Sequence, residues 1–428
     1  MKIAIIGAGW AGMAAAVTAT ELGHAAIVLE ATQASGGRSR GLKGLLPNGQ
    51  PVSLDNGQHI LIGAYTETLR LMQQVGVDPA AALLKLPMRL LFPDGAGLRF
   101  PAWPTPLDAL AGIAGARGWT LADKAALLRV ALGWQVKKFQ CEPHESVSAL
   151  CQKCSPRVLA ELIEPLCVSA LNTQASRASG QVFLRVMQDA LFGVQGGSRL
   201  LLPRVDLSAL FPAAAAQWIG ARGSALRLGA RAGSVQPQGA QWQVDGEVFD
   251  AVILATPASE SARLVGKSAL NPIWAEQAAA LAFEAITTVY AFAEGATLPH
   301  PMLALRSHAS DPKTAPAPAQ FVFDRGQLDG PQGLLAFVVS ASTGDRETLQ
   351  AQVLSQAKTQ LGLTLQAVQT VVEKRATFAC TPGLQRPAMH IAPGLLACGD
   401  YVAGPYPATL EGAVRSGVAA AQASSRKR

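Results

Sequence analysis

The N-terminus constrains the fold of this chain more than any other segment does. A short apolar run is followed by a glycine-rich turn, an alanine-rich run, a second apolar run and one acidic residue. Apolar runs of this length predict strands buried on both faces, and the whole order predicts a dinucleotide-binding α/β unit. The expected elements are a strand over residues 2–7, the turn Gly7-Ala8-Gly9-Trp10-Ala11-Gly12, a helix over residues 13–22, a strand over residues 25–29, and Glu30.

Each glycine of this G-x-G-x-x-G turn has a separate mechanical role. Gly7 allows the tight turn, Gly9 lets the backbone approach a pyrophosphate, and Gly12 lets the helix pack closely on the strand. The helix N-terminus then directs free N–H groups and a positive dipole end at the phosphates. Glu30 can accept hydrogen bonds from ribose hydroxyls, and its carboxylate would repel a 2′-phosphate, which argues against NADP.

A second glycine pair indicates which dinucleotide is bound. Gly36-Gly37-Arg38 follows Glu30 with the spacing E-x5-G-G-R, which is typical of FAD sites. The pair permits another close approach of the backbone to the cofactor, and the Arg38 guanidinium can neutralise pyrophosphate charge. The N-terminal region therefore predicts a Rossmann-like FAD site.

The C-terminal region carries further cofactor features. Residues 394–400 predict a buried strand that ends in Gly399-Asp400, and a loop with two prolines follows. The next segment predicts a helix whose N-terminus would stabilise an anionic reduced flavin. Its apolar positions at helical spacing are Leu410, Val414, Val418 and Ala421.

The cofactor domain is expected to be discontinuous. Residues 225–235 and 241–244 alternate like strands, and residues 249–256 predict a strand that returns to the dinucleotide sheet. We expect an α/β cofactor domain with an inserted α+β substrate-binding and membrane-facing domain. The division is residues 1–78, 196–262 and 374–428 for the first, and residues 79–195 and 263–373 for the second.

The inserted regions hold the apolar excess of the chain, which is 49% hydrophobic and only 15% charged. Residues 79–195 are predicted to be mostly helical, and their Leu, Phe and Trp form either a plain helical core or a surface that dips into a bilayer. Both interpretations stay open. The second inserted region, residues 263–373, has three β-like segments that are expected to form a sheet along one wall of a pocket. These segments are residues 285–293, 320–324 and 334–341, and a loop is expected at residues 314–318.

Charge and targeting signals exclude several classes of protein. Lys and Arg number 36 against 29 Asp and Glu, a net charge of +7, but the basic residues are scattered apart from residues 426–428. Nucleic-acid binding is therefore not expected, whereas docking on anionic lipid headgroups is favoured. The sequence has no signal-peptide h-region and no apolar stretch long enough to span a bilayer. We expect a cytoplasmic protein that can lie on the inner face of the cell membrane.

The six cysteines are expected to be reduced, buried thiols. Cys151-Gln152-Lys153-Cys154 has the spacing of half a zinc site, but structural zinc sites usually pair two such couples. We expect no metal.

Taken together, these motifs resemble the FAD-dependent amine oxidase and phytoene desaturase superfamily over the whole chain. More narrowly, the chain resembles the hydroxysqualene dehydroxylase family of bacterial squalene and hopanoid biosynthesis, also described as squalene-associated FAD-dependent desaturases. The segments that carry the narrower resemblance are Asp55-Asn56-Gly57-Gln58-His59, Gly63-Ala64-Tyr65, Pro165-Leu166-Cys167, Leu171-Asn172-Thr173, Phe323-Asp324-Arg325, Glu373-Lys374-Arg375-Ala376-Thr377-Phe378 and Arg386-Pro387.

The resemblance implies reductive loss of hydroxyl from hydroxysqualene, with reduced FAD as the hydride source and squalene as the product. An allylic alcohol leaves as water once it is protonated, so such a site needs a buried acid and an apolar tunnel. His59 and Asp55 are the first candidates for the acid, because their loop should run beside the flavin. Asp324, Tyr401 and Tyr406 come next. The alternative for His59 is a histidine that only braces the site.

Three other functions stay open. A carotenoid-type desaturase would use oxidised FAD to remove hydride from a polyene precursor. An amine oxidase would act on a small polar amine in an aromatic cage, for which four tyrosines are a thin supply. A non-catalytic flavin-bound scaffold in an isoprenoid-synthase complex would use the fold without the chemistry.

The expected catalytic residues are thus His59 and Asp55. The expected cofactor-binding residues are Gly7, Gly9, Trp10, Ala11, Gly12, Glu30, Gly36, Gly37, Arg38, Asn56, Gly57, Val235, Gly399, Asp400, Thr409 and Leu410.

Overall fold

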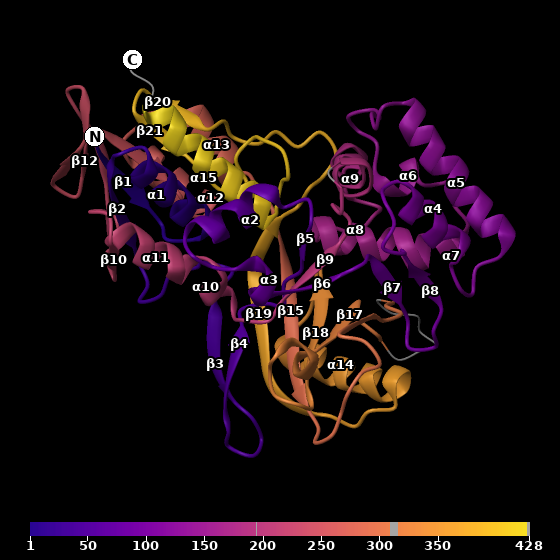
Figure 1. The fold of residues 1–428 in the computed structure, drawn as a ribbon. Coiled ribbons are helices and arrows are strands. Elements are labelled where there is room, and N and C mark those ends of the chain that lie inside the picture. Colours follow the sequence, from indigo (N-terminus) through magenta and orange to yellow (C-terminus); the bar gives the residue numbers. More distant parts are fainter. Residues whose placement is uncertain (194, 309–315, 426–428) are drawn as a thin grey trace.

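A six-stranded sheet joins the N-terminal, middle and C-terminal parts of the chain in the computed structural model, which describes residues 1–193, 195–308 and 316–425 (Figure 1). The strand order is β10-β2-β1-β14-β21-β20, parallel except for the last pair. The mid-chain strand β14 returns to this sheet beside β1, as the sequence predicts, and the C-terminal strand β21 pairs with β14. The strands are β1 (Lys2–Ile6), β2 (Ala25–Glu30), β10 (Ala225–Leu228), β14 (Ala251–Leu254), β20 (His390–Ala392) and β21 (Leu395–Ala397).

Helix α1 (Trp10–Glu21) is buried along almost its whole length. It packs against α15 (Leu410–Ser425) and α11 (Pro212–Gly220). The approach of α15 depends on Gly417, because a Cβ there would lie 2.1 Å from the Ala11 carbonyl oxygen. Small side chains on both helices therefore fix the start of α1 against the C-terminal helix.

The predicted strand over residues 225–235 is wrong in its extent. Strand β10 ends at Leu228, and a separate antiparallel sheet begins at Val235. The chain turns between them because Gly229 has a positive φ of 68° and the Asp245 carboxylate accepts hydrogen bonds from the Gly233 and Ser234 amides. The second sheet comprises β11 (Val235–Gln238), β12 (Gln241–Val244) and β13 (Glu247–Phe249).

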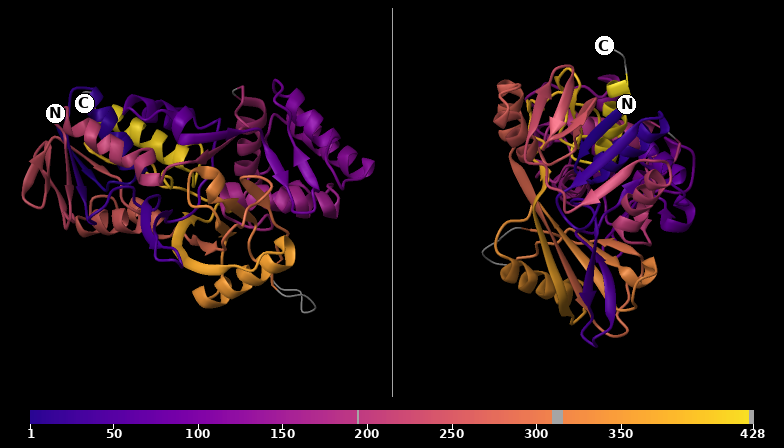
Figure 2. Two further views of the ribbon diagram at one scale, coloured as in Figure 1. Left: turned by 60° about the horizontal axis from the view of Figure 1, so that its bottom comes forward. Right: turned by 90° about the vertical axis from the view of Figure 1, so that its left-hand side faces the viewer.

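The three β-like segments of the later region form one antiparallel sheet, as expected, in the order β16-β17-β18-β15-β19. Helix α14 (Arg346–Leu361) packs against β15 and β19. Figure 2 shows this sheet and α14 projecting from the rest of the molecule. The strands are β15 (Phe283–Phe292), β16 (Met302–Ala304), β17 (Phe321–Asp324), β18 (Leu334–Ser340) and β19 (Gln366–Phe378). The predicted loop at residues 314–318 lies partly outside the described residues, and residues 426–428 lie outside them entirely.

Residues 79–195 are mostly helical, as predicted, but the part between α3 and α4 forms strands instead. There, β6 pairs with β9 and β7 pairs with β8. Pro156 begins helix α7, and the helix continues past Pro165 after a π-helical turn. The elements are α3 (Pro79–Ala82), β6 (Leu83–Leu86), β7 (Arg89–Leu91), β8 (Gly97–Arg99), α4 (Leu107–Ala114), α5 (Leu121–Val136), α6 (Val147–Leu150), α7 (Pro156–Val158), η1 (Leu159–Ile163), α8 (Glu164–Leu171), α9 (Gly180–Gln188) and η2 (Asp189–Gly193).

The remaining elements connect these parts. None of the helices within the described residues is long and apolar enough to cross a membrane. Five of the six cysteines are buried and Cys141 is half-buried. The connecting elements are β3 (Gly41–Leu45), β4 (Pro51–Asp55), β5 (Leu61–Ile62), α2 (Thr66–Gln74), β9 (Leu200–Pro203), α10 (Leu207–Leu210), α12 (Ala258–Lys267), α13 (Pro272–Ala279) and η3 (Arg325–Leu328).

Candidate functional site

The two glycine motifs of the N-terminal region are in direct contact. Gly9 and Gly36 form a β-bridge, and the Gly36 amide donates to the Ala8 carbonyl at 2.8 Å. A Cβ on Gly37 would lie 3.2 Å from the Gly9 Cα, whereas a Cβ on Gly9 would meet only the Gly37 Cα, at 4.0 Å. The backbone is therefore tightly packed between the two turns and open beside Gly9, as a cradle for a pyrophosphate requires.

The N-terminus of α1 has unused hydrogen-bond donors. Its N-cap, Gly9, offers no side chain to cap the helix. Among the described residues, no hydrogen bond reaches the amides of Trp10, Ala11 or Gly12. The Trp10 indole donates to the Ser39 carbonyl at 3.0 Å and so ties this turn to the second motif. Free amides at a buried helix start fit the phosphates of a dinucleotide.

Glu30 lies at the end of β2, facing the first turn. Its carboxylate accepts hydrogen bonds from the Ala8 amide at 2.8 Å and from the Thr32 amide at 2.9 Å. The Thr32 hydroxyl also donates to it. A carboxylate has about four acceptor positions, so one remains for a ribose hydroxyl.

Arg38 joins the N-terminal and C-terminal motifs. Its guanidinium donates to the Asp400 carboxylate at 2.5 Å and to the Ala376 carbonyl at 2.6 Å. The carboxylate is largely buried and the Arg38 side chain is 32% exposed, and their ion pair holds the turn after β21 against the second glycine pair. The sequence separation of the two residues is 362, and only the fold brings them together.

The start of α15 lies beside the same motifs. The Gly399 amide donates to the Ser416 hydroxyl at 3.0 Å, which fixes the Gly-Asp turn on this helix. The Thr409 hydroxyl accepts from the Gly412 amide and caps the helix just before Leu410. Val235 is placed differently: it is buried in β11 of the three-stranded sheet.

The loop of residues 55–59 runs against the second glycine motif. The Asn56 side-chain Nδ2 donates to the Arg38 carbonyl at 3.1 Å and to the Glu373 carboxylate at 3.0 Å. The His59 ring contacts the Gly57 carbonyl through Nδ1 at 2.6 Å and the Ser39 hydroxyl through Nε2 at 3.1 Å. Because a carbonyl only accepts, Nδ1 carries the proton and Nε2 is the acceptor in neutral His59. Burial lowers the pKa of His59, with a further lowering effect from Arg38, so the ring is neutral at pH 7.

Asp55 is buried on the other side of this loop. Its carboxylate accepts a hydrogen bond from the Leu207 amide at 2.8 Å, at the start of α10, and lies 4.0 Å from the Arg325 guanidinium. Burial raises the pKa of Asp55 to about 6, against the lowering effects of the Leu207 amide and Arg325. Of the two expected acids, Asp55 thus holds its proton into the range near neutrality and His59 does not.

The three further acid candidates are engaged in other contacts. The Asp324 carboxylate accepts hydrogen bonds from the Leu298 and Gly326 amides, which makes it an anchor for the β17–η3 corner. The Tyr401 hydroxyl donates to Ser261 at 2.9 Å, and burial raises its pKa. Tyr406 lies under the Arg415 guanidinium, 5.1 Å from the ring centre.

Four residues around the site were not among the expected site residues. Ser39 bonds His59, Glu373 bonds Asn56, and Tyr290 and Arg325 lie beside Asp55. Glu373 and Arg325 lie in segments that carry the family resemblance, so the sequence did point to them. Ser39 and Tyr290 have no signal in the sequence, because their partners come from other elements.

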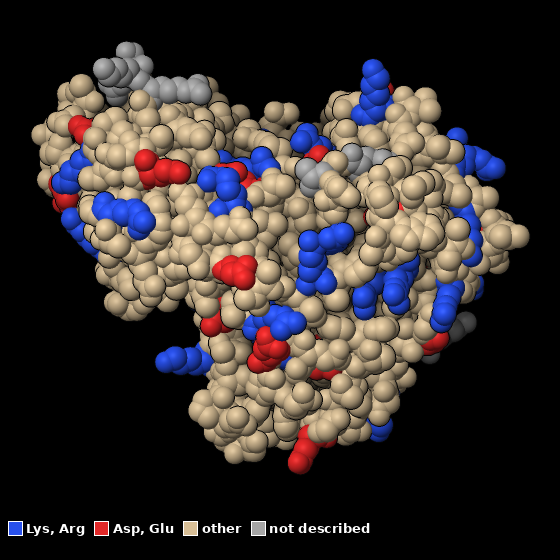
Figure 3. All heavy atoms as spheres, viewed as in Figure 1, with Lys and Arg blue, Asp and Glu red and all other residues tan. Residues whose placement is uncertain are grey.

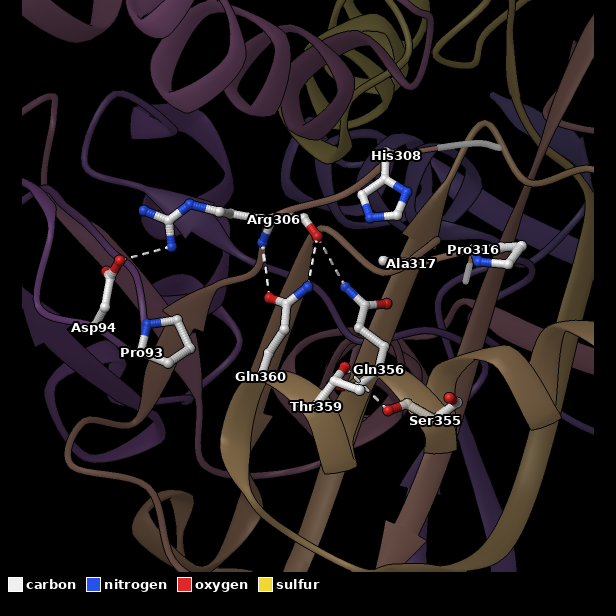
Figure 4. A pocket seen from close by; sticks show the side chains of 10 residues that line it. All are labelled: Pro93, Asp94, Arg306, His308, Pro316, Ala317, Ser355, Gln356, Thr359 and Gln360. Atoms are coloured by element: carbon white, nitrogen blue, oxygen red, sulfur yellow. Dashed lines mark hydrogen bonds and ion pairs between the residues drawn. The ribbon is translucent and has the colours of Figure 1, made fainter. Parts of the chain in front are cut away.

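The cavity in Figure 4 is lined by other residues than those of the cofactor motifs. That cavity, of about 450 Å³, lies between the β7–β8 turn and α14. Its polar groups bond one another: the Arg306 amide and carbonyl pair with the Gln360 side chain, and its guanidinium pairs with Asp94 at 2.9 Å. Such mutual pairing makes the cavity a junction between two parts of the fold.

Comparisons with known proteins agree with this geometry. Residues 10–423 match the family described as flavin containing amine oxidoreductase. The chain is similar to a solved oxidoreductase from Methanosarcina mazei, with a TM-score of 0.73 at 16% identity, over 99% of this chain and 100% of that one.

Among curated proteins, the chain is 26% identical to a hydroxysqualene dehydroxylase of Rhodopseudomonas palustris, over 97% of this chain and 96% of the relative. It is 25% identical to a second hydroxysqualene dehydroxylase, from Sinorhizobium fredii, over 98% and 97% of the two chains. A zeta-carotene desaturase of Zea mays is 37% identical, but over only 18% of this chain and 13% of its own.

Proposed function

The chain belongs to the flavin containing amine oxidoreductase family and is an FAD-dependent oxidoreductase, and from this premise we propose that it converts hydroxysqualene to squalene. The observation that carries the proposal is near-complete coverage of two hydroxysqualene dehydroxylases, set against the short match to a carotenoid desaturase. The reaction replaces the hydroxyl of an allylic alcohol by hydrogen. It therefore consumes one hydride and one proton, and it releases water.

The proposed cofactor site consists of the two glycine turns, the α1 N-terminus and the Gly399-Asp400 turn. The free amides of Trp10 and Ala11 would bind phosphate oxygens. Gly9 leaves space for the pyrophosphate, and Arg38 contributes positive charge already oriented by Asp400. Reduced FAD, when bound, supplies the hydride. These contacts come from the start of α1 and from the turn between β2 and β3.

We propose Asp55 as the proton source of the reaction and His59 as a positioning residue. A general acid functions best when its pKa lies near the working pH, and the pKa of about 6 for buried Asp55 meets this condition. Neutral His59 instead clamps the Gly57 carbonyl and Ser39, which fixes the loop beside the flavin site.

Substitutions separate these two roles. Asp55→Asn keeps an acceptor for the Leu207 amide and removes the proton, so turnover should fall roughly a hundredfold or more. His59→Gln should weaken FAD retention and leave the pH dependence of turnover unchanged. Unchanged turnover in Asp55→Asn would exclude it as the acid.

We further propose that helices α4 and α5 dock on the cytoplasmic membrane, where an apolar C30 substrate dissolves. Helix α5 buries Leu127, Val130 and Trp134, yet its opposite side exposes Leu121 by 85% and Val136 by 84%. A helix apolar on both sides is expected in a protein core or at a lipid surface. Trp103, Leu107, Leu110 and Leu132 are exposed in the same region.

Charge on this side of the molecule fits an anionic bilayer. Lys and Arg side chains predominate over the right-hand part of Figure 3, where Figure 1 places the helical region. Juxtamembrane basic residues each add about 1 kcal/mol of attraction to anionic lipid. The arrangement supports reversible attachment of the helical region to the inner leaflet.

The function is tested by product analysis. FAD-loaded protein, hydroxysqualene and a chemical reductant should yield squalene. Parallel incubations with phytoene and with putrescine should yield no product. Formation of desaturated phytoene or of an oxidised amine, without squalene, would refute the proposal in favour of a desaturase or an amine oxidase. A flavin-bound protein that is inactive on all three substrates would favour the non-catalytic scaffold.

A further inference from the structure

Three arginines and a histidine gather at or beside a second cavity, away from the cofactor motifs. Arg89 and Arg99 are directly opposed in the antiparallel β7–β8 pair, so their side chains leave the same face of the ribbon. Arg117 forms a β-bridge with Gly97, at the start of β8. Arg99, Arg117 and His300 line the cavity, whose volume is about 470 Å³.

This arrangement is electrostatically unfavourable without a negative counter-charge. Like charges directly opposed across a strand pair destabilise it. Arg89 is half-buried, and its Nε atom is buried without a hydrogen-bond partner. His300 lies close enough to Arg89 and Arg99 for its pKa to be lowered, first by burial and then by these two charges.

No Asp or Glu carboxylate of the described residues neutralises the positive charge of this cluster. Within the parts of the chain that the structure describes, none of the four side chains forms an ion pair with Asp or Glu. The β7–β8 turn does contain Asp94, but its carboxylate pairs with Arg306 at 2.9 Å (Figure 4).

Arg306, which follows β16 and contacts the turn of this hairpin, is a useful comparison. It has two acidic partners, Asp94 and Glu161, and its guanidinium lies 4.6 Å from the Phe92 ring centre. Arg99 and Arg117 have exposed guanidinium groups and no such partners among the described residues. Arg306 is therefore neutralised by acidic partners, whereas Arg99 and Arg117 line the cavity without such partners among the described residues.

The geometry points to a phosphate-binding site formed by Arg89, Arg99, Arg117 and His300. Arginine presents paired N–H donors that match phosphate oxygens, and two strand-paired arginines with a third beside them can surround one such group. Gly95, Gly97 and Gly115 also line the cavity, and none of them has a side chain that would occupy it. The phosphate belongs either to a free anion or to a lipid headgroup, and this inference does not depend on the proposed reaction.

The test uses the full chain loaded with FAD, so that the dinucleotide site is filled. Two probes are titrated: inorganic pyrophosphate in solution by calorimetry, and phosphatidylcholine vesicles containing phosphatidylglycerol by cosedimentation. The variants are Arg99→Gln and Arg117→Gln. Arg346→Gln is the matched control, because Arg346 is exposed at the start of α14 and makes no ion pair among the described residues.

Loss of one arginine contact should weaken phosphate binding about tenfold or more. An effect of Arg99→Gln and Arg117→Gln on pyrophosphate binding identifies a site for free anions, and an effect confined to vesicles identifies a headgroup site. Arg99→Lys keeps the charge but loses the paired donors, so it should give an intermediate result. Absence of binding to both probes, or an equal loss in Arg346→Gln, would overturn the site.

Discussion

Replacing Asp55 by Asn should change how the stability of the protein depends on pH. The carboxyl is only 1% exposed, and burial raises its pKa from 3.8 to about 6. A carboxyl whose pKa is raised by folding contributes stability that is complete below pH 3.8 and is lost as the pH rises through about 6. At 1.36 kcal/mol per pKa unit, the loss is about 3 kcal/mol.

The variant lacks this titration, so its unfolding temperature should fall less than that of the parent between pH 4 and pH 8. The entropy of unfolding is about 0.9 kcal/mol/K for a chain of this length, so the difference should reach roughly 3 °C. Differential scanning fluorimetry of the FAD-loaded proteins measures it. Asp78→Asn is the control, because Asp78 is an exposed N-cap and Asn caps equally well. If the unfolding temperatures of the parent and Asp55→Asn changed with pH by the same amount, the reasoning would be refuted.

Three further predictions concern other contacts. Arg38→Gln should weaken FAD binding about tenfold or more in a flavin-release titration, because it removes positive charge from the pyrophosphate site and leaves Asp400 unpaired; unchanged affinity would exclude that role. Gly417→Ala should destabilise the protein by about 1–3 kcal/mol through overpacking against α1, whereas Gly133→Ala, which meets nothing within 4 Å, should be neutral or stabilising; equal effects in chemical denaturation would contradict the close packing. Leu121→Gln should reduce binding to anionic vesicles about tenfold, and Ile273→Gln, at an exposed apolar position on α13, should not; an equal loss would show that the attachment is unspecific.

The cofactor half of the fold could be predicted because its signals are local. The strand, turn, helix and strand of residues 2–30 each follow from apolar periodicity and glycine spacing, and β21 and α15 follow in the same way. The hairpin at residues 89–99 could not be predicted, because its strands are only three residues long and their pairing depends on neighbouring elements.

The same distinction holds for the site. Gly9 and Gly37 are recognisable in the sequence because backbone approach demands glycine there. The Arg38–Asp400 pair and the contact of Asp55 with Leu207 join residues 362 and 152 positions apart, so only the packed structure shows them. The protonation state of a buried group depends on such contacts. The sequence could therefore name Asp55 and His59 as candidates but could not distinguish their roles.

The direction of electron transfer is the central claim, and a single-turnover reaction tests it most directly. The FAD-loaded protein is reduced chemically without oxygen, freed of excess reductant, and mixed with hydroxysqualene. We predict that oxidised-flavin absorbance returns and that one squalene forms per flavin. Flavin that stays reduced, with hydroxysqualene recovered intact, would contradict the account.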